Sequence, residues 1–388
     1  MKNTALWLLL PLGLTGGLPV SATELTIATF NVSMEAENYA AKGDTLGPQV
    51  LTTQLKSGSN QQIRNIASII QQVQPDILLL NEFDYIADPA DGVLLFIRNY
   101  LEKPQLQGQP VSYPYFYYQT VNTGQPSGFD LNNDGQVNTP GEDAWGFGQY
   151  PGQYGMVLLS KYPIDLNKVR TFQQFKWRDM PGHKLTRKTD GSPWFAADAW
   201  QQMPLSSKSH WDIPVMVDGK PLHILASHPT PPVFDGPENR NGNRNHDEVR
   251  FWVDYLNNAA YFYDDRGNKG GYNQTAPFVV VGDLNSSAVE GDAFRQAIQA
   301  LLGHKTIQSD RTPQSKGAAK HSPDNPLAAS HTAGWRMRAD YVLPSRAGVQ
   351  VLDSGVFWPA ADEPLHQVVS SRGTSSDHRL VWVKLQLK

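Results

Sequence analysis

Short apolar segments with the composition of buried strands recur along the chain and alternate with amphipathic helical segments. Residues 25–30 and 76–80 are the clearest strands, and isoleucines recur at helical spacing between residues 60 and 73. Runs that are apolar throughout indicate strands buried on both faces, and helices with one apolar side indicate a layer that covers a sheet. Because no linker rich in Gly, Ser and Pro interrupts the pattern, we predict one α/β domain over residues 23–388.

The other elements are expected from the same patterns. The polar stretch from the first strand to about residue 58 is expected to be a loop, and long loops are expected to carry function. Further strands are expected at residues 115–121, 154–160, 221–227, 277–281, 337–343 and 380–385, helices at 93–101 and 246–262, and long loops at 122–153, 177–212 and 304–334.

The first 22 residues have the pattern of a secretory signal peptide. Lys2 is their only charge, an apolar run covers residues 5–14, and small residues precede the expected cleavage after Ala22. A membrane anchor is the alternative, but the run is shorter than the ~20 apolar residues that span a bilayer. We therefore expect residues 1–22 to be removed and the protein to be secreted or periplasmic, without stable membrane insertion.

Composition excludes several functions. The chain has no cysteine, which rules out disulfides, thiolate zinc sites and a cysteine nucleophile. Its formal net charge of −4 argues against a broad basic surface that coats nucleic acid, although a local site for phosphate stays open. No feature of the sequence points to a protein partner.

Polar residues of one chemical kind follow the apolar runs. Each one alone is more typical of a turn, but together they predict a site where strand ends converge. Asn, Asp and Glu offer the hard oxygens that Mg²⁺, Mn²⁺ or Ca²⁺ prefer, and histidines hold or move protons near neutral pH. This set suits the hydrolysis of a phosphate ester by activated water. The residues are Asn31, Asn81, Glu82, His228, Asp283, Asn285, Asp340, Asp377 and His378.

These motifs resemble, in order, those of the endonuclease/exonuclease/phosphatase family, the DNase I-like metal-dependent phosphoesterases. Gly282-Asp283-Leu284-Asn285 and Ser376-Asp377-His378 are the most specific, and residues 155–164 look like the family's central strand and the turn after it. The resemblance spans about residues 24–388. It implies a four-layer α/β sandwich, in which two stacked mixed β-sheets are flanked by helices and the site lies at one end.

The resemblance also implies a role for each site residue. Glu82 would be the main ligand of Mg²⁺ or Mn²⁺, with Asn31 and Asp377 nearby. Asp283 would orient or deprotonate the attacking water, and Asn285 would hold the phosphate. His378, oriented by Asp340, would contact the phosphate, and His228 would stabilise developing charge or aid the leaving group.

The chain departs from the family pattern in two places. Ser33 stands where many relatives carry an acid two positions after the Asn. The family's tyrosine or arginine before the central strand has three candidate matches here, Tyr150, Gln153 and Tyr154.

Two further segments admit two interpretations each. Asp130, Asn132 and Asp134 stand at positions 1, 3 and 5 of a segment like the first half of a calcium-binding loop, but position 12 is Gly141 in place of Glu. This segment either binds Ca²⁺ or forms a solvated turn.

In the segment after His228, Arg240, Arg244 and His246 either bind substrate phosphate or stay outside the site. In the second case Asn245 or Asp247 caps the following helix, and the arginines are exposed or pair with Asp235 and Glu238.

The favoured function is therefore an exported metal-dependent phosphoesterase whose substrate is a nucleic acid, a nucleotide, a phospholipid or a sugar phosphate. The alternative is a calcium-dependent binding module on a catalytically decayed fold, which the intact set of site residues disfavours. A glycosidase is disfavoured because no pair of carboxylates stands out.

Overall fold

The computed structural model describes residues 23–388, so the expected signal peptide lies outside the described residues. One sheet has six strands in the order β10-β11-β1-β2-β4-β3, where β1 and β2 run parallel and the other pairs antiparallel. Its strands are β1 (Glu24–Met34), β2 (Ile77–Phe83), β3 (Tyr115–Tyr118), β4 (Met156–Ser160), β10 (Val349–Val356) and β11 (Val381–Leu387).

The second sheet has five strands in the order β5-β6-β7-β8-β9, and only β7 and β8 are parallel. Its strands are β5 (Arg170–Thr171), β6 (His210–Val217), β7 (Lys220–Ser227), β8 (Phe278–Asp283) and β9 (Asp340–Pro344). Both sheets are therefore mixed.

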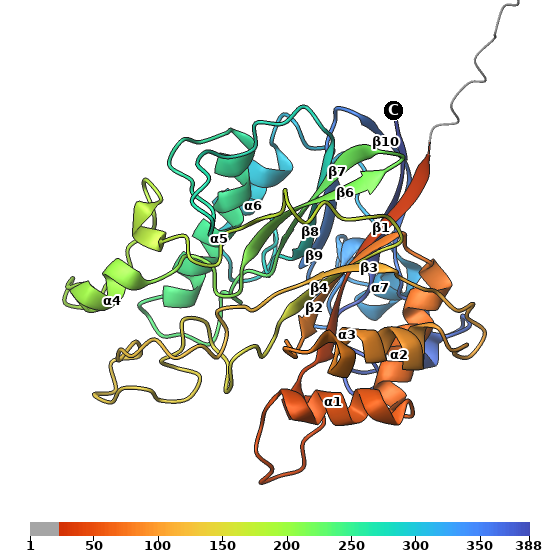
Figure 1. The fold of residues 1–388 in the computed structure, drawn as a ribbon, viewed down its shortest axis with the longest axis horizontal. Coiled ribbons are helices and arrows are strands. Elements are labelled where there is room, and N and C mark those ends of the chain that lie inside the picture. The colour runs from red at the N-terminus through yellow and green to blue at the C-terminus, as the bar shows by residue number, and fades with distance from the viewer. Residues whose placement is uncertain (1–22) are drawn as a thin grey trace, which may run out of the picture.

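Helices cover the outer faces of the two sheets (Figure 1). On the side of the six-stranded sheet lie α1 (Pro48–Ser57), α2 (Gln61–Val73), α3 (Val93–Phe96), which continues as a π-turn over Ile97–Leu101, and α7 (Lys316–His321). Helices α5 (Arg240–Leu256) and α6 (Arg295–Leu302) cover the five-stranded sheet, and α4 (Ala197–Gln202) lies at the edge of the molecule. The DNase I-like fold of two stacked sheets between helices is confirmed.

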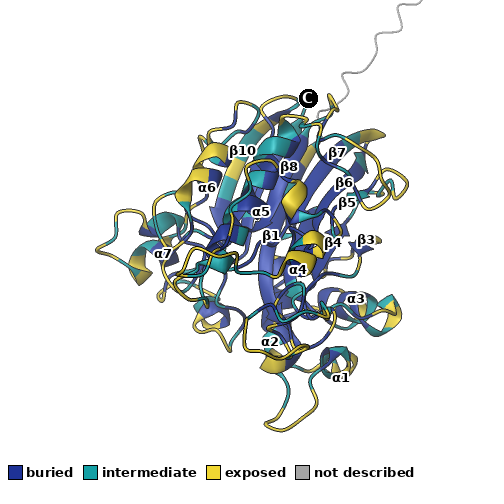
Figure 2. Cartoon of the chain, turned by 90° about the vertical axis from the view of Figure 1, so that its left-hand side faces the viewer, coloured by how far each residue is buried: buried dark blue, intermediate teal, exposed yellow. Residues whose placement is uncertain are grey.

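Two apolar clusters hold these layers together, and Figure 2 shows the buried strands between more exposed helices. Alternate residues of β8 face opposite clusters, as the two-residue period of a strand requires. Val279 and Val281 join the cluster between the sheets and under α2, whereas Val280 joins the cluster beneath α5 and α6. The stacked sheets thus share one interior, and their strand ends are brought to a common edge.

Two expectations about helices are wrong. The region expected to be a loop up to residue 58 contains α1, whose apolar face is narrow because only Leu51 and Leu55 are buried. Helix α5 begins at Arg240, six residues before the expected start and well before the expected cap residues. The carboxylate of Asp235 accepts a hydrogen bond from the amide of Asn241 at 2.6 Å, which stabilises this earlier start.

Within the described part of the chain, no helix combines the length and the apolar character needed to cross a membrane.

Candidate active site

The two sheets meet at their polar strand ends through hydrogen bonds to Asp283, the last residue of β8. Nδ2 of Asn31, on β1, donates to Oδ2 of Asp283 at 3.1 Å. The amide of Asp283 donates to Oδ1 of Asn81, on β2, at 3.1 Å. Residues about 200 or more positions apart in sequence are thereby fixed against one another, because each lies at the end of a rigid buried strand.

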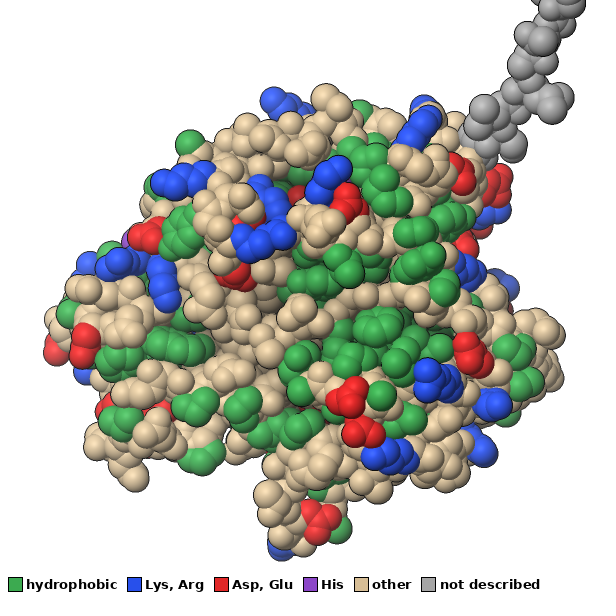
Figure 3. Space-filling view, viewed as in Figure 1, with side chains coloured by type: hydrophobic (Ala, Val, Ile, Leu, Met, Phe, Trp, Pro, Cys, Tyr) green, Lys and Arg blue, Asp and Glu red, His purple; other side chains and the backbone are tan. Residues whose placement is uncertain are grey.

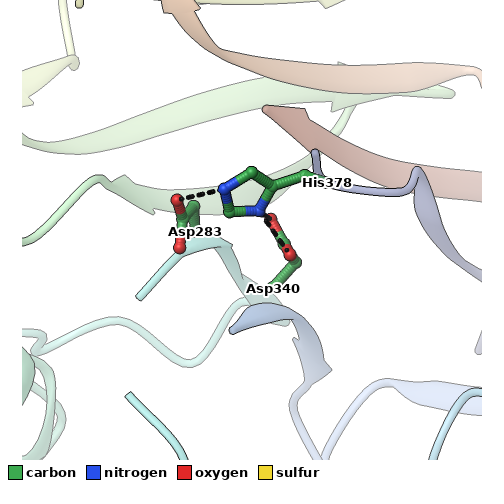
Figure 4. A group of neighbouring side chains, drawn as sticks. All are labelled: Asp283, Asp340 and His378. Carbon is green, nitrogen blue, oxygen red and sulfur yellow. Dashed lines mark hydrogen bonds and ion pairs between the residues drawn. The ribbon is translucent and has the colours of Figure 1, made fainter. Parts of the chain in front are cut away.

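His378 lies between two carboxylates in a buried row (Figure 4). Its Nδ1 is 2.9 Å from Oδ2 of Asp340, and its Nε2 is 3.4 Å from Oδ2 of Asp283. Thr332 fixes the far end of the row, since its hydroxyl donates to Asp340 at 2.7 Å and accepts from the amide of Asp340. The carboxylate of Asp340 therefore sets the orientation of the imidazole.

This row perturbs the pKa of its members. Burial lowers the pKa of His378, but the negative charges of Asp340 and Asp283 outweigh burial and raise it to about 10. Burial raises the pKa of Asp283 to about 7, although the nearby His378 opposes the change. At neutral pH the row therefore carries an imidazolium at His378 beside a carboxyl group that exchanges its proton near pH 7.

His228, directly after β7, approaches the same carboxylate and has the opposite electrostatics. Its Nε2 is 3.5 Å from Oδ2 of Asp283, and neither ring nitrogen has a hydrogen-bond partner, although the side chain is buried. Burial lowers the pKa of His228 well below its usual value, and the positive charges of Lys208 and His378 lower it further. His228 is therefore a neutral imidazole with an uncommitted nitrogen facing the site.

Asn285 is held rigidly beside Asp283. Its amide donates to Oδ1 of Asp283 at 2.9 Å, and its Nδ2 donates to the carbonyl of Pro229 at 3.1 Å. Its φ of 49° lies in the left-handed region, where a non-glycine residue is strained, and such strain concentrates at functional sites.

The three residues expected to bind metal lie at or next to groups of this centre. Asn31 contacts Asp283 directly, and Asp377 is 3.4 Å from the hydroxyl of Ser33. Glu82 is half-buried with a φ of 55°, and its carboxylate has no hydrogen-bond or ion-pair partner within residues 23–388. An uncommitted carboxylate in a polar setting fits a hard divalent cation.

A second set of ligand atoms also clusters here. Among the described residues, Asp283, Asp340 and His378 form the one group of three or more acidic or histidine side chains whose ligand atoms lie within 4.8 Å. Nδ1 of His378 is hydrogen-bonded to Asp340 and its Nε2 forms an ion pair with Asp283, so this group is better suited to proton handling than to holding an ion.

Acidic residues missed by sequence reasoning lie beside Glu82. Burial raises the pKa of Glu35 to about 7, and the charge of Glu82 contributes to this rise. Burial also raises the pKa of Asp84 to about 8, against a lowering hydrogen bond from Tyr150. All three residues that could match the family's missing tyrosine or arginine contact these acids. Gln153 donates to Glu35 at 3.3 Å, the amide of Tyr154 donates to Asp84 at 3.1 Å, and Tyr150 donates its hydroxyl to Asp84.

Lys208 is the other residue that sequence reasoning missed. It is 5% exposed and has no ion-pair partner within the described range. Burial lowers its pKa, while Glu248, Glu82 and Asp283 oppose that change, so it lies within electrostatic reach of the site. The only signal in the sequence was a lysine among serines just before an apolar segment, which is too common to single out.

The two arginines expected at the substrate are committed to the protein. Arg240 pairs with Glu238, and its guanidinium also lies 3.4 Å from Glu142. Arg244 donates to the carbonyl groups of Leu205 and Pro204 at 2.8 and 3.0 Å. Arg240 thus follows the pairing alternative, and Arg244 is engaged by backbone.

Neither expected cap residue caps α5, because both lie inside the helix and are buried. Asn245 donates to the carbonyls of Thr230 and Leu284, which ties the segment after His228 to the end of β8. Asp247 accepts a hydrogen bond from the indole of Trp177 at 2.7 Å.

The candidate calcium loop is closed by its own hydrogen bonds. Asp130 accepts from the amides of Asn133 and Gly135, and Asn132 accepts from the amide of Asp134. Asp143, which is buried, accepts from the amides of Leu131 and Thr139. These contacts are typical of a polar turn, and calcium binding at Asp130, Asn132 and Asp134 stays a prediction.

The surface around these elements gives no continuous basic stripe on the face drawn in Figure 3, where Lys and Arg side chains are scattered among apolar and acidic ones. This agrees with the acidic balance of the chain.

Comparison with known proteins gives one family and several distant structures. The model of the Endonuclease/Exonuclease/phosphatase family matches residues 28–378, and no curated protein matches the sequence. An endonuclease/exonuclease/phosphatase from Beutenbergia cavernae is 17% identical over 94% of this chain and 72% of its own, with a TM-score of 0.48. Sphingomyelinase C from Streptomyces griseocarneus is 16% identical over 93% and 99%, with a TM-score of 0.43. A mutant beta toxin from Staphylococcus aureus with bound magnesium ions is 15% identical over 94% and 100%, with a TM-score of 0.41.

Proposed function

Because this chain belongs to the endonuclease/exonuclease/phosphatase family, we propose that it is a metal-dependent phosphoesterase. It hydrolyses a phosphodiester or phosphomonoester by direct attack of water, without a covalent enzyme intermediate. The substrate class is a nucleic acid, a nucleotide, a phospholipid or a sugar phosphate.

The observation that carries this proposal is the buried carboxylate of Asp283 between two histidines in different protonation states. His378 on one side is an imidazolium held by Asp340, and His228 on the other is neutral. A general base works best when its pKa is near the working pH, and burial raises the pKa of Asp283 to about 7.

The roles of the protein groups follow from this arrangement. Asp283 takes a proton from the attacking water, whose oxygen forms a new bond to phosphorus while the bond to the leaving oxygen breaks. The imidazolium of His378 and the side-chain amide of Asn285 stabilise the negative charge that develops on the phosphoryl oxygens. The neutral His228 donates a hydrogen bond from its uncommitted ring to the leaving oxygen and so stabilises the negative charge that develops there, and the leaving oxygen then takes a proton from solvent.

A divalent cation supplies charge neutralisation at the phosphate when it is bound. The free carboxylate of Glu82, with Asn31 and Asp377 near it, would hold Mg²⁺ or Mn²⁺. Lys208 adds a positive charge that favours an anionic substrate at the same site.

The decisive experiment measures hydrolysis of bis-p-nitrophenyl phosphate with Mg²⁺. We expect turnover that EDTA abolishes, that added Mg²⁺ restores, and that His378→Ala reduces by at least 10²-fold. A folded, metal-binding protein with no turnover on any phosphoester would instead favour the calcium-dependent binding module. Plasmid DNA, RNA, nucleotides, phospholipid vesicles and phytate, tested with Mg²⁺, Mn²⁺ and Ca²⁺ separately, then identify the substrate class.

We further propose that the protein is exported and that residues 1–22 are its signal peptide, on the sequence pattern alone. Expression of the full chain in a bacterial host tests this, since N-terminal sequencing of the exported product should begin at Thr23.

A further inference from the structure

Ser33 stands where many relatives carry an acid, but its side chain offers no carboxylate to the site. The register of β1 against β2 shifts between Asn31 and Met34, and Ser33 has a φ of 48° at this bulge. At this bulge its hydroxyl lies against the C-terminal motif, 3.2 Å from the hydroxyl of Ser376 and 3.4 Å from Asp377. If a second carboxylate serves the site, another residue must supply it.

Glu35 follows two residues later on the same segment and is 2% exposed. Its Oε2 accepts hydrogen bonds from the amide of Glu37 at 2.8 Å and from Nε2 of Gln153 at 3.3 Å. These contacts cap the short 3₁₀ turn Ala36–Asn38. They use only one carboxylate oxygen, and Oε1 accepts no hydrogen bond from residues 23–388. A capping role therefore leaves the second oxygen of this carboxylate uncommitted.

Glu35 and Glu82 lie at the adjoining ends of β1 and β2, because Met34, next to Glu35, pairs with Phe83, next to Glu82. The negative charge of Glu82 accordingly disfavours ionisation of Glu35. The carboxylate of Glu82 itself has no partner in the described chain.

Lys208 is buried, and the charges of Glu82 and Asp283 both act on it. It nevertheless makes no ion pair within 4.0 Å among the described residues. Glu35 is buried, Glu82 is half-buried, and two neighbouring carboxylates without a paired cation repel each other. A bound divalent cation would offset this repulsion.

The neighbouring acid Asp84 is not an equivalent candidate. Its oxygens accept from the amide of Ala36 at 3.0 Å, from the amide of Tyr154 at 3.1 Å, and from the hydroxyl of Tyr150. Both of its oxygens are engaged, and these bonds hold the turn that carries Glu35. Asp84 therefore positions Glu35 and leaves it free to act.

We propose that Glu35 is a carboxylate ligand of the divalent cation, which it shares with Glu82, and that it supplies the acid that Ser33 lacks. The inference rests on the proposed metal dependence and adds to it a ligand on the segment after β1. Asp84 and Gln153 are then positioning residues for this ligand.

Binding of Mn²⁺ to the purified protein, measured by electron paramagnetic resonance, tests the inference without reference to turnover. Glu35→Gln keeps the oxygen that caps the turn but removes the charge, and we expect it to weaken Mn²⁺ binding at least tenfold. Glu37→Gln is the matched control, because Glu37 is exposed and only two residues away, and it should bind as the unmodified protein does. Glu82→Gln should abolish binding at the same site.

The outcomes separate this inference from the proposed function. If Glu35→Gln binds Mn²⁺ normally while Glu82→Gln does not, Glu35 is no ligand, although the metal-dependent function stands. If Glu35→Gln fails to fold, Glu35→Asp provides the test, because it keeps the charge but withdraws it by one methylene. Glu35→Asp is expected to bind more weakly than the unmodified protein, and unchanged affinity would overturn the inference. Normal binding by both Glu35→Gln and Glu82→Gln would overturn the inference and the metal site together.

Discussion

Replacing Lys208 with methionine should make the protein more stable and less active. Lys208 is 5% exposed, burial lowers its pKa, and no carboxylate pairs with it directly in the described chain. Methionine has a similar length and no charge to bury. Burying a polar group without a hydrogen bond costs about 1–3 kcal/mol, so we expect Lys208→Met to raise the free energy of unfolding by about that amount.

The same substitution removes a positive charge that lies within electrostatic reach of Glu82 and Asp283. A hydrogen bond to a charged group contributes about 1.5–3 kcal/mol, which corresponds to a loss of about 10- to 150-fold in kcat/KM. Hydrolysis of bis-p-nitrophenyl phosphate measures the activity, and urea unfolding measures the stability. Lys161→Met is the control, because Lys161 directly follows β4 and pairs with Asp76 at 3.0 Å. This variant should lose at most about 1 kcal/mol of stability, with unchanged activity.

Higher stability together with lower activity would indicate that Lys208 serves activity at a cost in stability. The reasoning fails if Lys208→Met lowers stability and activity together, because Lys208 would then be a structural residue. It also fails if kcat/KM stays within twofold of the unmodified protein.

Three further predictions follow from the same structure. Asp340→Asn should lower kcat roughly 10²- to 10⁴-fold and lower the pKa of His378, which NMR titration of the imidazole measures, since the variant loses the carboxylate that orients and charges the ring. Burial lowers the pKa of His210 to about 4, so the unfolded chain takes up a proton that the folded protein excludes, and stability falls as the pH drops from about 6.5 toward 4. Urea unfolding of His210→Gln should lose about 2 kcal/mol less between pH 7 and pH 5 than the unmodified protein, and an equal loss would contradict this assignment. Leu79→Ala, at a fully buried position, should cost about 2–5 kcal/mol in urea unfolding, whereas Leu166→Ala, 61% exposed, should change stability by less than about 0.5 kcal/mol.

Local pattern predicted the strands that are apolar throughout and missed those that are not. Residues 76–80 and 277–281 became β2 and β8 with bounds that agree within a few residues. β6 was missed because Pro214 interrupts its pattern. Pro214 still pairs with His223 of β7 and its carbonyl accepts from the amide of Asp165, whereas β5 pairs with β6 only at residues 211 and 212. Proline thus stands beyond the part of β6 that β5 covers.

Order along the chain predicted which residues would meet, because strand ends converge wherever two sheets stack. Position after an apolar run was enough to group four residues that the structure brings together, namely Asn31, Asp283, Asp340 and His378. The protonation states of these groups could not be predicted from the sequence in the same way. The opposite protonation of His228 and His378 depends on which charges lie within a few ångströms of each ring.

The sequence by itself therefore determined the fold class and the chemical type of the site, since both depend on residue type and spacing. Tertiary structure alone decided that Arg240 and Arg244 are engaged by the protein, and that Glu35 and Lys208 belong beside Glu82. The physical reason is that burial and electrostatic interactions act over short distances in space, and sequence separation does not specify those distances.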